Sequence, residues 1–461
     1  MCVLQQVRGR YQSPAFAALV FVICASMQIA HSDEVKPSDQ PLKKRLAGLM
    51  RELDADQRAR RIHAERELLD LGPAILDELP PPELIANPAV RTSVSKIRKV
   101  LELRKATESI RPSTITTAAG ITFEEFVKNM AVQTSNQIDM RLLTPKELQW
   151  TVPQAFQGET FWNAVDATLS KSMIRANFHP EAAALVLLPR EKQAPNNQLA
   201  VHRVGPYRVV LESLKLRPIA GSTQQRLRAD LSVTPEPRLR ALFLKFQAKD
   251  FFVTTMKGKI FPPADPDAQL DLPLGEGGHY VRWTLDFLAP PDLAASELEN
   301  LHITGKATMQ VAAESEHIRI KDLAVAEGVA RRRGGVTVSV MKVQARELPN
   351  EKRDISVRIQ VAYDAGGPAF ESHRTWIFHN QVYLEPLEGE PIRANGGYET
   401  NLQANGVVGV TYRFTGVRTP LNQLQFVYVA PTLIIDSPLS FELVSEKAAN
   451  GPGKSTAVPA G

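Results

Sequence analysis

Alternation of apolar and polar residues over about half of the chain is the feature that most constrains its fold. Strand-length segments with this pattern recur from Tyr207 to Leu443, and proline or glycine separates many of them. A strand with one apolar and one polar face is half-buried, so it pairs with other strands over a shared core. Many such strands joined by turns favour antiparallel β-sandwiches.

The alternating segments fall into two sets, one on each side of the stretch Arg331–Gly335, which we interpret as a hinge. The first set predicts a sandwich over residues 200–330, and the second predicts another over residues 334–447. Both sets open with an alternating strand that a second one follows after a similar interval, which indicates two similar sandwiches in tandem. Residues 448–461 are small and polar, which predicts a disordered tail.

Residues 41–110 follow a helical period instead. Apolar residues recur there at spacings of three and four, which is typical of amphipathic helices. The pair Gly72–Pro73 ends one helix and begins the next. The stretch resembles a HEAT-type helical repeat in three segments, residues 53–56, 64–74 and 87–91. Because solenoids need three or more repeats and this stretch is barely longer than one, the resemblance implies a packing or docking element.

Residues 111–190 combine helix and strand signals. The run Thr122–Glu125 is a capping box, in which the Thr122 hydroxyl and the Glu125 carboxylate each satisfy a backbone N–H at a helix start. A second helix start follows at Thr160. The order resembles the short N-terminal domain shared by secretins and TonB-dependent receptors in three segments, residues 121–126, 133–138 and 160–166. The resemblance implies a small αβ module of two strand–helix–strand units that mediates protein contacts. The chain as a whole is therefore predicted to be an α+β multidomain protein.

Residues 1–32 have the pattern of a secretory signal peptide. Arg8 and Arg10 precede the mostly apolar run Ala15–Ile29, and small residues stand before a cleavage point at Asp33. The run is shorter than the about 20 apolar residues that span a bilayer. We interpret the segment as an export signal. An uncleaved N-terminal anchor is the alternative, and it is the one route to membrane association that we expect.

The cysteine content, the charge distribution and the absence of known catalytic motifs exclude several classes of function. Both cysteines, Cys2 and Cys24, lie in the predicted leader, so the mature chain has no disulfide, thiol nucleophile or thiolate metal site. The net charge is +5 with both signs interspersed, whereas a nucleic-acid-binding protein concentrates its basic residues. We therefore expect no nucleic-acid partner. No HExxH, CxxC or GxSxG motif occurs, so we expect no enzyme activity, cofactor or metal.

Two features remain as candidate sites. The segment 265–276 is an acidic loop with two prolines, and it is either a solvated connection or a calcium site. On a strand, four alternate residues would share one face: Arg374, Trp376, Phe378 and Asn380. That face is either part of a sandwich core or an aromatic binding surface.

The order of segments is similar to that of a family of secreted bacterial proteins with no assigned activity. The resemblance rests on the segments 363–373, 376–380 and 428–433. It implies a periplasmic, cell-surface or extracellular location. We therefore predict an exported, non-enzymatic interaction or structural protein that contacts an envelope protein. The alternative is a secreted carbohydrate-binding or carbohydrate-processing protein that uses the Trp376 face.

Overall fold

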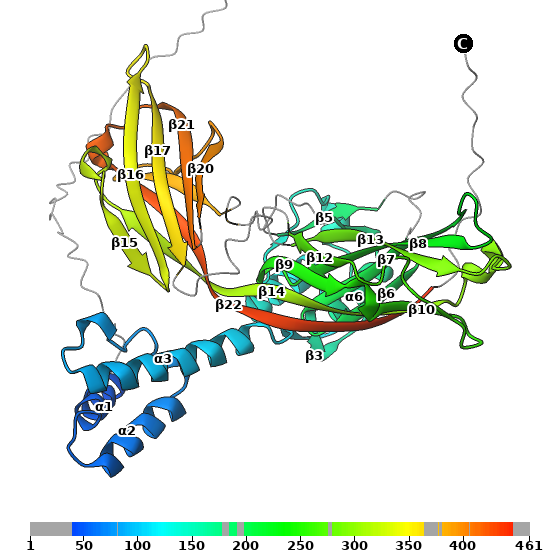
Figure 1. Ribbon diagram of the computed structural model, residues 1–461, viewed down its shortest axis with the longest axis horizontal. Helices are drawn as coiled ribbons and strands as arrows, with labels where there is room; N and C mark the ends of the chain where they lie inside the picture. Colours follow the sequence, from blue (N-terminus) through cyan, green and yellow to red (C-terminus); the bar gives the residue numbers. More distant parts are fainter. Residues whose placement is uncertain are drawn as a thin grey trace, which may run out of the picture.

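The protein is β-rich and built from several antiparallel sheets, as the alternation predicts (Figure 1). The predicted leader, the tail and part of the Trp376 face lie outside the residues that the structure describes. The computed structural model describes residues 39–80, 82–177, 184–190, 198–274, 279–363, 377, 380–404 and 406–445.

Two long strands form a ribbon on which both sandwiches are built. Strand β14 (His302–Ile320) pairs antiparallel with β22 (Leu424–Val444) from one end to the other. With 19 residues, β14 spans about 60 Å at about 3.3 Å per residue. That length exceeds one sandwich, and β22 runs along one sandwich and then into the other (Figure 1).

The first sandwich packs a four-stranded sheet against one half of the ribbon. The four strands are ordered β13–β8–β7–β6, and their bounds are Val281–Ala289, Gln225–Pro235, Tyr207–Pro218 and Ala200–Val204. Four strands extend the ribbon on the opposite sheet: β9 (Arg240–Gln247), β10 (Phe251–Thr254), β11 (Ile260–Phe261) and β12 (Gln269–Pro273). The two sheets enclose one apolar core.

The second sandwich packs a five-stranded sheet against the other half of the ribbon. The five strands are ordered β15–β16–β17–β21–β20, with bounds Ala330–Arg333, Val336–Glu347, Arg353–Tyr363, Val407–Val417 and Tyr398–Ala404. Strands β18 (Val382–Pro386) and β19 (Ile392–Arg393) extend the ribbon on this side. A separate apolar core fills this sandwich.

The shared ribbon differs from the expected pair of sandwiches over the contiguous stretches 200–330 and 334–447. Leu439 and Phe441, from the end of the second stretch, complete the first core. Ile318, from the first stretch, lies in the second core. Alternation shows that a strand has a buried face, but it does not show which core that face enters when the strand is longer than one sandwich.

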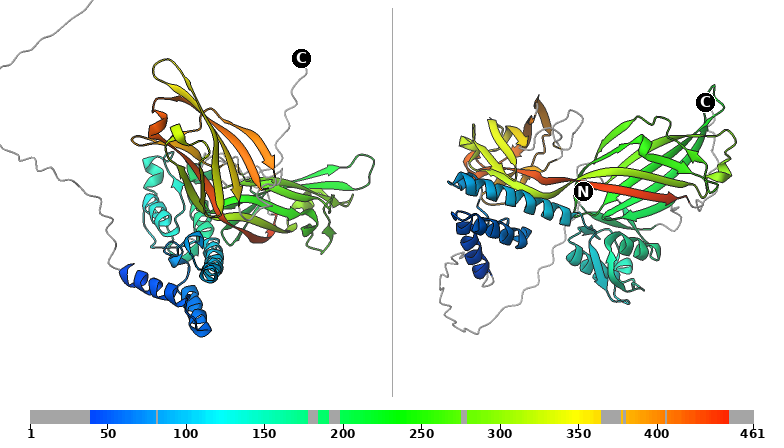
Figure 2. Two further views of the ribbon diagram at one scale, coloured as in Figure 1. Left: turned by 60° about the vertical axis from the view of Figure 1, so that its left-hand side comes forward. Right: turned by 60° about the horizontal axis from the view of Figure 1, so that its bottom comes forward.

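The N-terminal part of the described chain is helical. It comprises α1 (Asp39–Glu52), α2 (Arg58–Asp70), two short 3-10 turns (Pro73–Ile75 and Pro82–Leu84) and α3 (Pro88–Ser109). The apolar residues at helical spacing form a small core of their own, with Leu68, Val94 and Leu101 at its centre. The C-terminal end of α3 leaves this core and lies against the ribbon (Figure 2).

Next comes a small αβ unit. Helix α4 (Phe123–Thr134) begins where predicted, and the Thr122 hydroxyl accepts a hydrogen bond from the Glu125 N–H at 3.2 Å. The second of the two longer helices in this unit, α6, spans Phe161–Ser170. A short helix and five strands complete the unit: α5 (Pro145–Leu148), β1 (Thr114–Thr117), β2 (Ile138–Asp139), β3 (Phe156–Thr160), β4 (Ile174–Asn177) and β5 (Leu185–Pro189).

Asp166 of α6 docks the αβ unit on the first sandwich. Its carboxylate accepts hydrogen bonds from Arg203 at 2.6 Å and from the buried Arg208 at 2.9 Å. The Trp162 indole N–H also donates to the Pro206 carbonyl at 3.1 Å. Charge-assisted hydrogen bonds of this kind are stronger than neutral ones, so α6 is held firmly over strands β6 and β7.

A buried carboxylate joins three parts of the chain. Glu236, between β8 and β9, is fully buried. It accepts from the Ser113 N–H at 2.9 Å, from the Asn136 amide at 3.3 Å and from Arg238 Nε at 2.6 Å. Arg238 in turn donates to the carbonyl of Ser109, at the end of α3, at 2.6 Å. The helical segment, the αβ unit and the first sandwich therefore meet at one ion pair.

The shared ribbon predicts that the first sandwich cannot fold without β22. A fragment covering residues 39–333 retains every other strand of that sandwich but lacks Leu439, Phe441 and Leu443. We expect it to lose near-ultraviolet circular dichroism and to bind a dye for exposed apolar surface, because three core side chains and one side of β14 are missing. The full chain is the control. A cooperative, native-like unfolding transition of the fragment would contradict the prediction.

Candidate functional site

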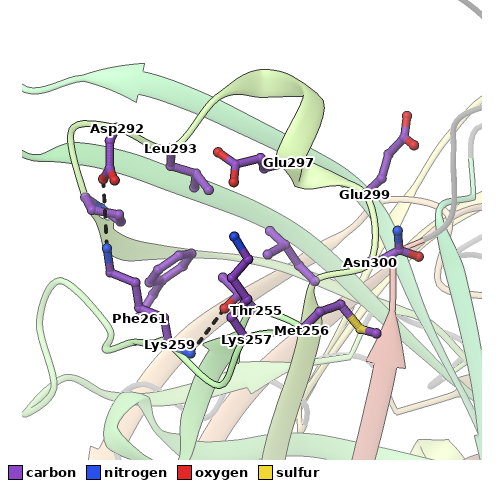
Figure 3. A pocket seen from close by; sticks show the side chains of 12 residues that line it. Thr255, Met256, Lys257, Lys259, Phe261, Asp292, Leu293, Glu297, Glu299 and Asn300 are labelled. Carbon is purple, nitrogen blue, oxygen red and sulfur yellow. Dashed lines mark hydrogen bonds and ion pairs between the residues drawn. The ribbon is translucent and has the colours of Figure 1, made fainter.

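A cavity of about 350 Å³ opens at one end of the first sandwich (Figure 3). One wall is the β10–β11 hairpin, and the other is the connection from β13 to β14, residues 290–301. Phe261, Leu293 and Leu301 are buried and give the cavity an apolar base. Hairpins and connections at sandwich ends are where such folds place binding surfaces, because the strands beneath hold them rigidly.

Charges of opposite sign line the two walls of the cavity. The hairpin carries Lys257 and Lys259, and the connection carries Asp292, Glu297 and Glu299 (Figure 3). Lys259 Nζ lies 3.8 Å from the Asp292 carboxylate, so these two form an exposed ion pair across the cavity. The site therefore combines an apolar base with a rim of both charges.

Exposed apolar side chains adjoin the cavity, with Thr254 and the ion pair of His302 with Glu442 between them. Ile260, Thr254, His302 and Val444 form one row across four paired strands, a width of about 14 Å at about 4.8 Å per strand. Phe252 lies two residues along from Thr254 and so points to the same face of the sheet. We call four residues the tip patch: Phe252 (41% exposed), Met256 (74%), Ile260 (62%) and Val444 (39%).

The sequence carries a signal for the tip patch that strand alternation obscures. Phe251, Phe252 and Val253 are three successive apolar residues, whereas a strand with one solvated face alternates. Phe251 and Val253 are buried, so Phe252 is the residue that breaks the pattern by pointing outward. The apolar pattern predicts a strand at this position, and the extra apolar residue is the signal that one apolar side chain faces outward.

The structure describes one of the four residues that make up the predicted face around Trp376. Arg374, Trp376 and Phe378 lie outside the described residues. Asn380 is 6% exposed, and its amide donates to the Tyr428 hydroxyl at 2.8 Å while its carbonyl accepts from Arg240 at 3.2 Å. Since Arg240 belongs to the first sandwich and Tyr428 to the second, Asn380 contributes to a polar contact between them.

Burial changes the acidity of the groups around this contact. It lowers the pKa of the Arg240 guanidinium and raises that of the Tyr428 hydroxyl, because each charged form loses hydration. Burial also lowers the pKa of His279 to about 4, and the positive charge of Arg240 contributes in the same direction. His279 is therefore neutral at physiological pH.

The acidic loop is only partly described. Asp265 and Asp267 are exposed, Asp271 is half-buried in β12, and Glu276 lies outside the described residues. Within the described ranges, no three histidine, aspartate or glutamate side chains are grouped as metal ligands. The part of the chain that the structure covers also contains no helix with the length and apolar character to cross a membrane.

No known relative assigns a function to these features. The chain matches no protein-family model, and no curated protein matches it. The site is therefore defined by its geometry alone: an apolar base, a rim of both charges and the adjoining tip patch.

His279 makes the stability of the protein depend on pH. Its pKa is about 4 in the folded protein and about 6.5 when unfolded. The stability that comes from keeping His279 neutral is complete above about pH 6.5. It is lost as the pH falls towards 4, because in this range the unfolded chain binds the proton and the folded protein does not. From pH 7.5 to 5.0 we expect His279 to account for a loss of about 2 kcal/mol in the free energy of unfolding. Urea titrations of the wild type and His279→Gln at both values measure it. Equal losses in the two proteins would contradict the assignment.

Proposed function

We propose that the chain is an exported, non-enzymatic protein of a bacterial envelope that acts through contacts with another envelope protein. The tip patch is the observation that carries this proposal. Large exposed apolar side chains gathered at one place on a surface mark an interaction site. Four such side chains lie here at one end of the first sandwich, three of them on the β10–β11 hairpin and one on β22, beside a cavity with an apolar base.

The surroundings of the tip patch favour a protein as its ligand. Protein interfaces combine an apolar centre with a polar rim. The cavity walls supply such a rim, with Lys257 on one side and Glu297 and Glu299 on the other. Because both signs are present, a membrane or nucleic acid of uniform negative charge gains little from this surface, whereas a protein surface of mixed charge complements it.

The N-terminal parts add a second contact surface to the proposal. The resemblances of residues 41–110 to a HEAT-type repeat and of residues 111–190 to the secretin and TonB-receptor short domain both belong to modules that bind proteins. In this proposal they contact the same envelope partner as the tip patch and add to its binding. The leader at residues 1–32 would direct the chain through the membrane.

Carbohydrate binding remains the alternative function. It rests on Trp376 and Phe378 as an aromatic surface, and it does not involve the tip patch. A glycan array on the wild type and Trp376→Ala tests it separately. Specific sugar binding that this substitution abolishes without loss of fold would favour the alternative.

Aspartates in the tip patch should abolish partner binding. We expect the double variant Met256→Asp and Ile260→Asp to lose at least ten-fold in retention of an envelope protein, because charges are buried in the interface without counterions. Both residues are exposed, so folding is unaffected. The measurement is affinity capture from solubilised envelope, with cross-linking from a photoreactive residue at position 252.

A matched control uses another exposed apolar residue. Leu387, which follows β18 in the second sandwich, is 76% exposed, so Leu387→Asp makes the same kind of change outside both proposed contact surfaces. The control should retain the partner. Equal retention by the double variant would refute the role of the tip patch, and polysaccharide retained without protein would favour the carbohydrate alternative. Mass spectrometry of the bait's N-terminal peptide tests cleavage before Asp33.

A further inference from the structure

The ribbon of β14 and β22 has a break in its strand pairing where it passes from one sandwich to the other. Among the described residues, β14 and β22 each contribute to both cores, and Leu242 and Phe243 of β9 also enter the second core. The ladder pairs Ala312 with Ile434 and then Glu314 with Thr432, and it omits the pair between them, Ala313 and Leu433. The register is unchanged on both sides, so this is a local break in the pairing.

Leu433 explains the break in the pairing. Its φ is 50°, which lies in the left-handed region that β-carbon sterics disfavour for a leucine. A strand residue with this conformation cannot keep its ladder hydrogen bonds, so the ribbon bends there. The break also falls at the boundary of the cores, because Val311 belongs to the first core and Ala312 to the second.

Helix α3 spans this break. At its C-terminal end it is tied to the first sandwich, because Arg238 donates to the carbonyls of Ser109 and Arg111. One turn earlier, Lys105 forms an ion pair with Glu314, which lies just beyond the break on the second-sandwich side. Figure 2 shows α3 lying along the ribbon, and α3 contacts both of its strands.

We propose that α3 is a strap that fixes the angle between the two sandwiches across a hinge at Ala313 and Leu433. The tie to Arg238 is largely buried, whereas the Lys105–Glu314 pair is half-exposed. The ion pair is therefore the part of the strap that opens, because water competes with an exposed pair. A ligand that draws the helical segment away from Glu314 frees the hinge. This inference does not depend on the proposed function.

A second contact limits how far the hinge moves. Arg240 of the first sandwich, Asn380 and Tyr428 of the second form the buried polar contact described above. This contact does not involve α3, so it remains when the strap opens. We therefore expect release of α3 to widen the range of angles between the sandwiches, and not to separate them.

The experiment measures the distance between the sandwiches directly. Replacing Cys2 and Cys24 by serine leaves the full chain without cysteine, so two new cysteines can carry spin labels. Ser440→Cys labels the exposed face of the first sandwich, and Arg358→Cys labels that of the second. Double electron–electron resonance then gives the distribution of distances. We expect one narrow distribution for the wild-type strap and a clearly broader one for Lys105→Glu.

Charge reversal tests the ion pair, and two further variants keep the result decisive. The double variant Lys105→Glu with Glu314→Lys should restore the narrow distribution. Lys99→Glu makes the same change elsewhere on α3 and should leave it unchanged. Added to Lys105→Glu, in which the strap is open, Leu433→Gly loosens the hinge itself and should broaden the distribution further. An unchanged distribution in Lys105→Glu, with the circular dichroism of the wild type, would overturn the strap. No further broadening when Leu433→Gly is added would overturn the hinge.

Discussion

The pairing of β14 with β22 is the constraint on which the rest of the structure depends. The ladder extends from His302 opposite Val444 to Ile320 opposite Phe426. Its inward side chains enter the first core over one half and the second core over the other. Two sandwiches that share a ribbon are coupled mechanically, whereas tandem domains on a linker are free to rotate. With α3 in place across the break at Leu433, the tip patch, at one end of this ribbon, is held in a defined direction relative to the second sandwich.

Glu236 imposes a second constraint, at the place where the chain enters the β-rich part. A buried carboxylate is stable only when its charge and its lone pairs are satisfied. Here the donors come from the segment after α3, from the turn after α4 and from Arg238. The ion pair itself lies within the first sandwich, and the two N-terminal parts supply neutral hydrogen-bonding groups to it. Displacement of either part therefore leaves hydrogen bonds of this pair unmade.

Local patterns in the sequence predict where helices and strands lie better than they predict which strands pair with one another. The helix start at Thr122, the helical stretch before residue 110 and the alternating strands all follow from periodicity and capping, which depend on nearby residues. The sharing of β14 and β22 could not be predicted in this way, because it depends on which strands meet across more than a hundred residues. The tip patch was missed for a related reason: Phe252 is one apolar residue among buried neighbours, and its direction depends on the register of β10 against β14.

The strand order also determines when the protein can complete its fold. β22 lies after every other strand in the described chain, and both cores need it. An N-terminal portion emerging from a ribosome therefore holds two incomplete sandwiches at once, with the apolar faces of β14 uncovered until residues 424–444 arrive. Such late, long-range closure is slow and leaves the intermediate open to aggregation. The two sandwiches thus complete their folding together, after the last described strand has been made.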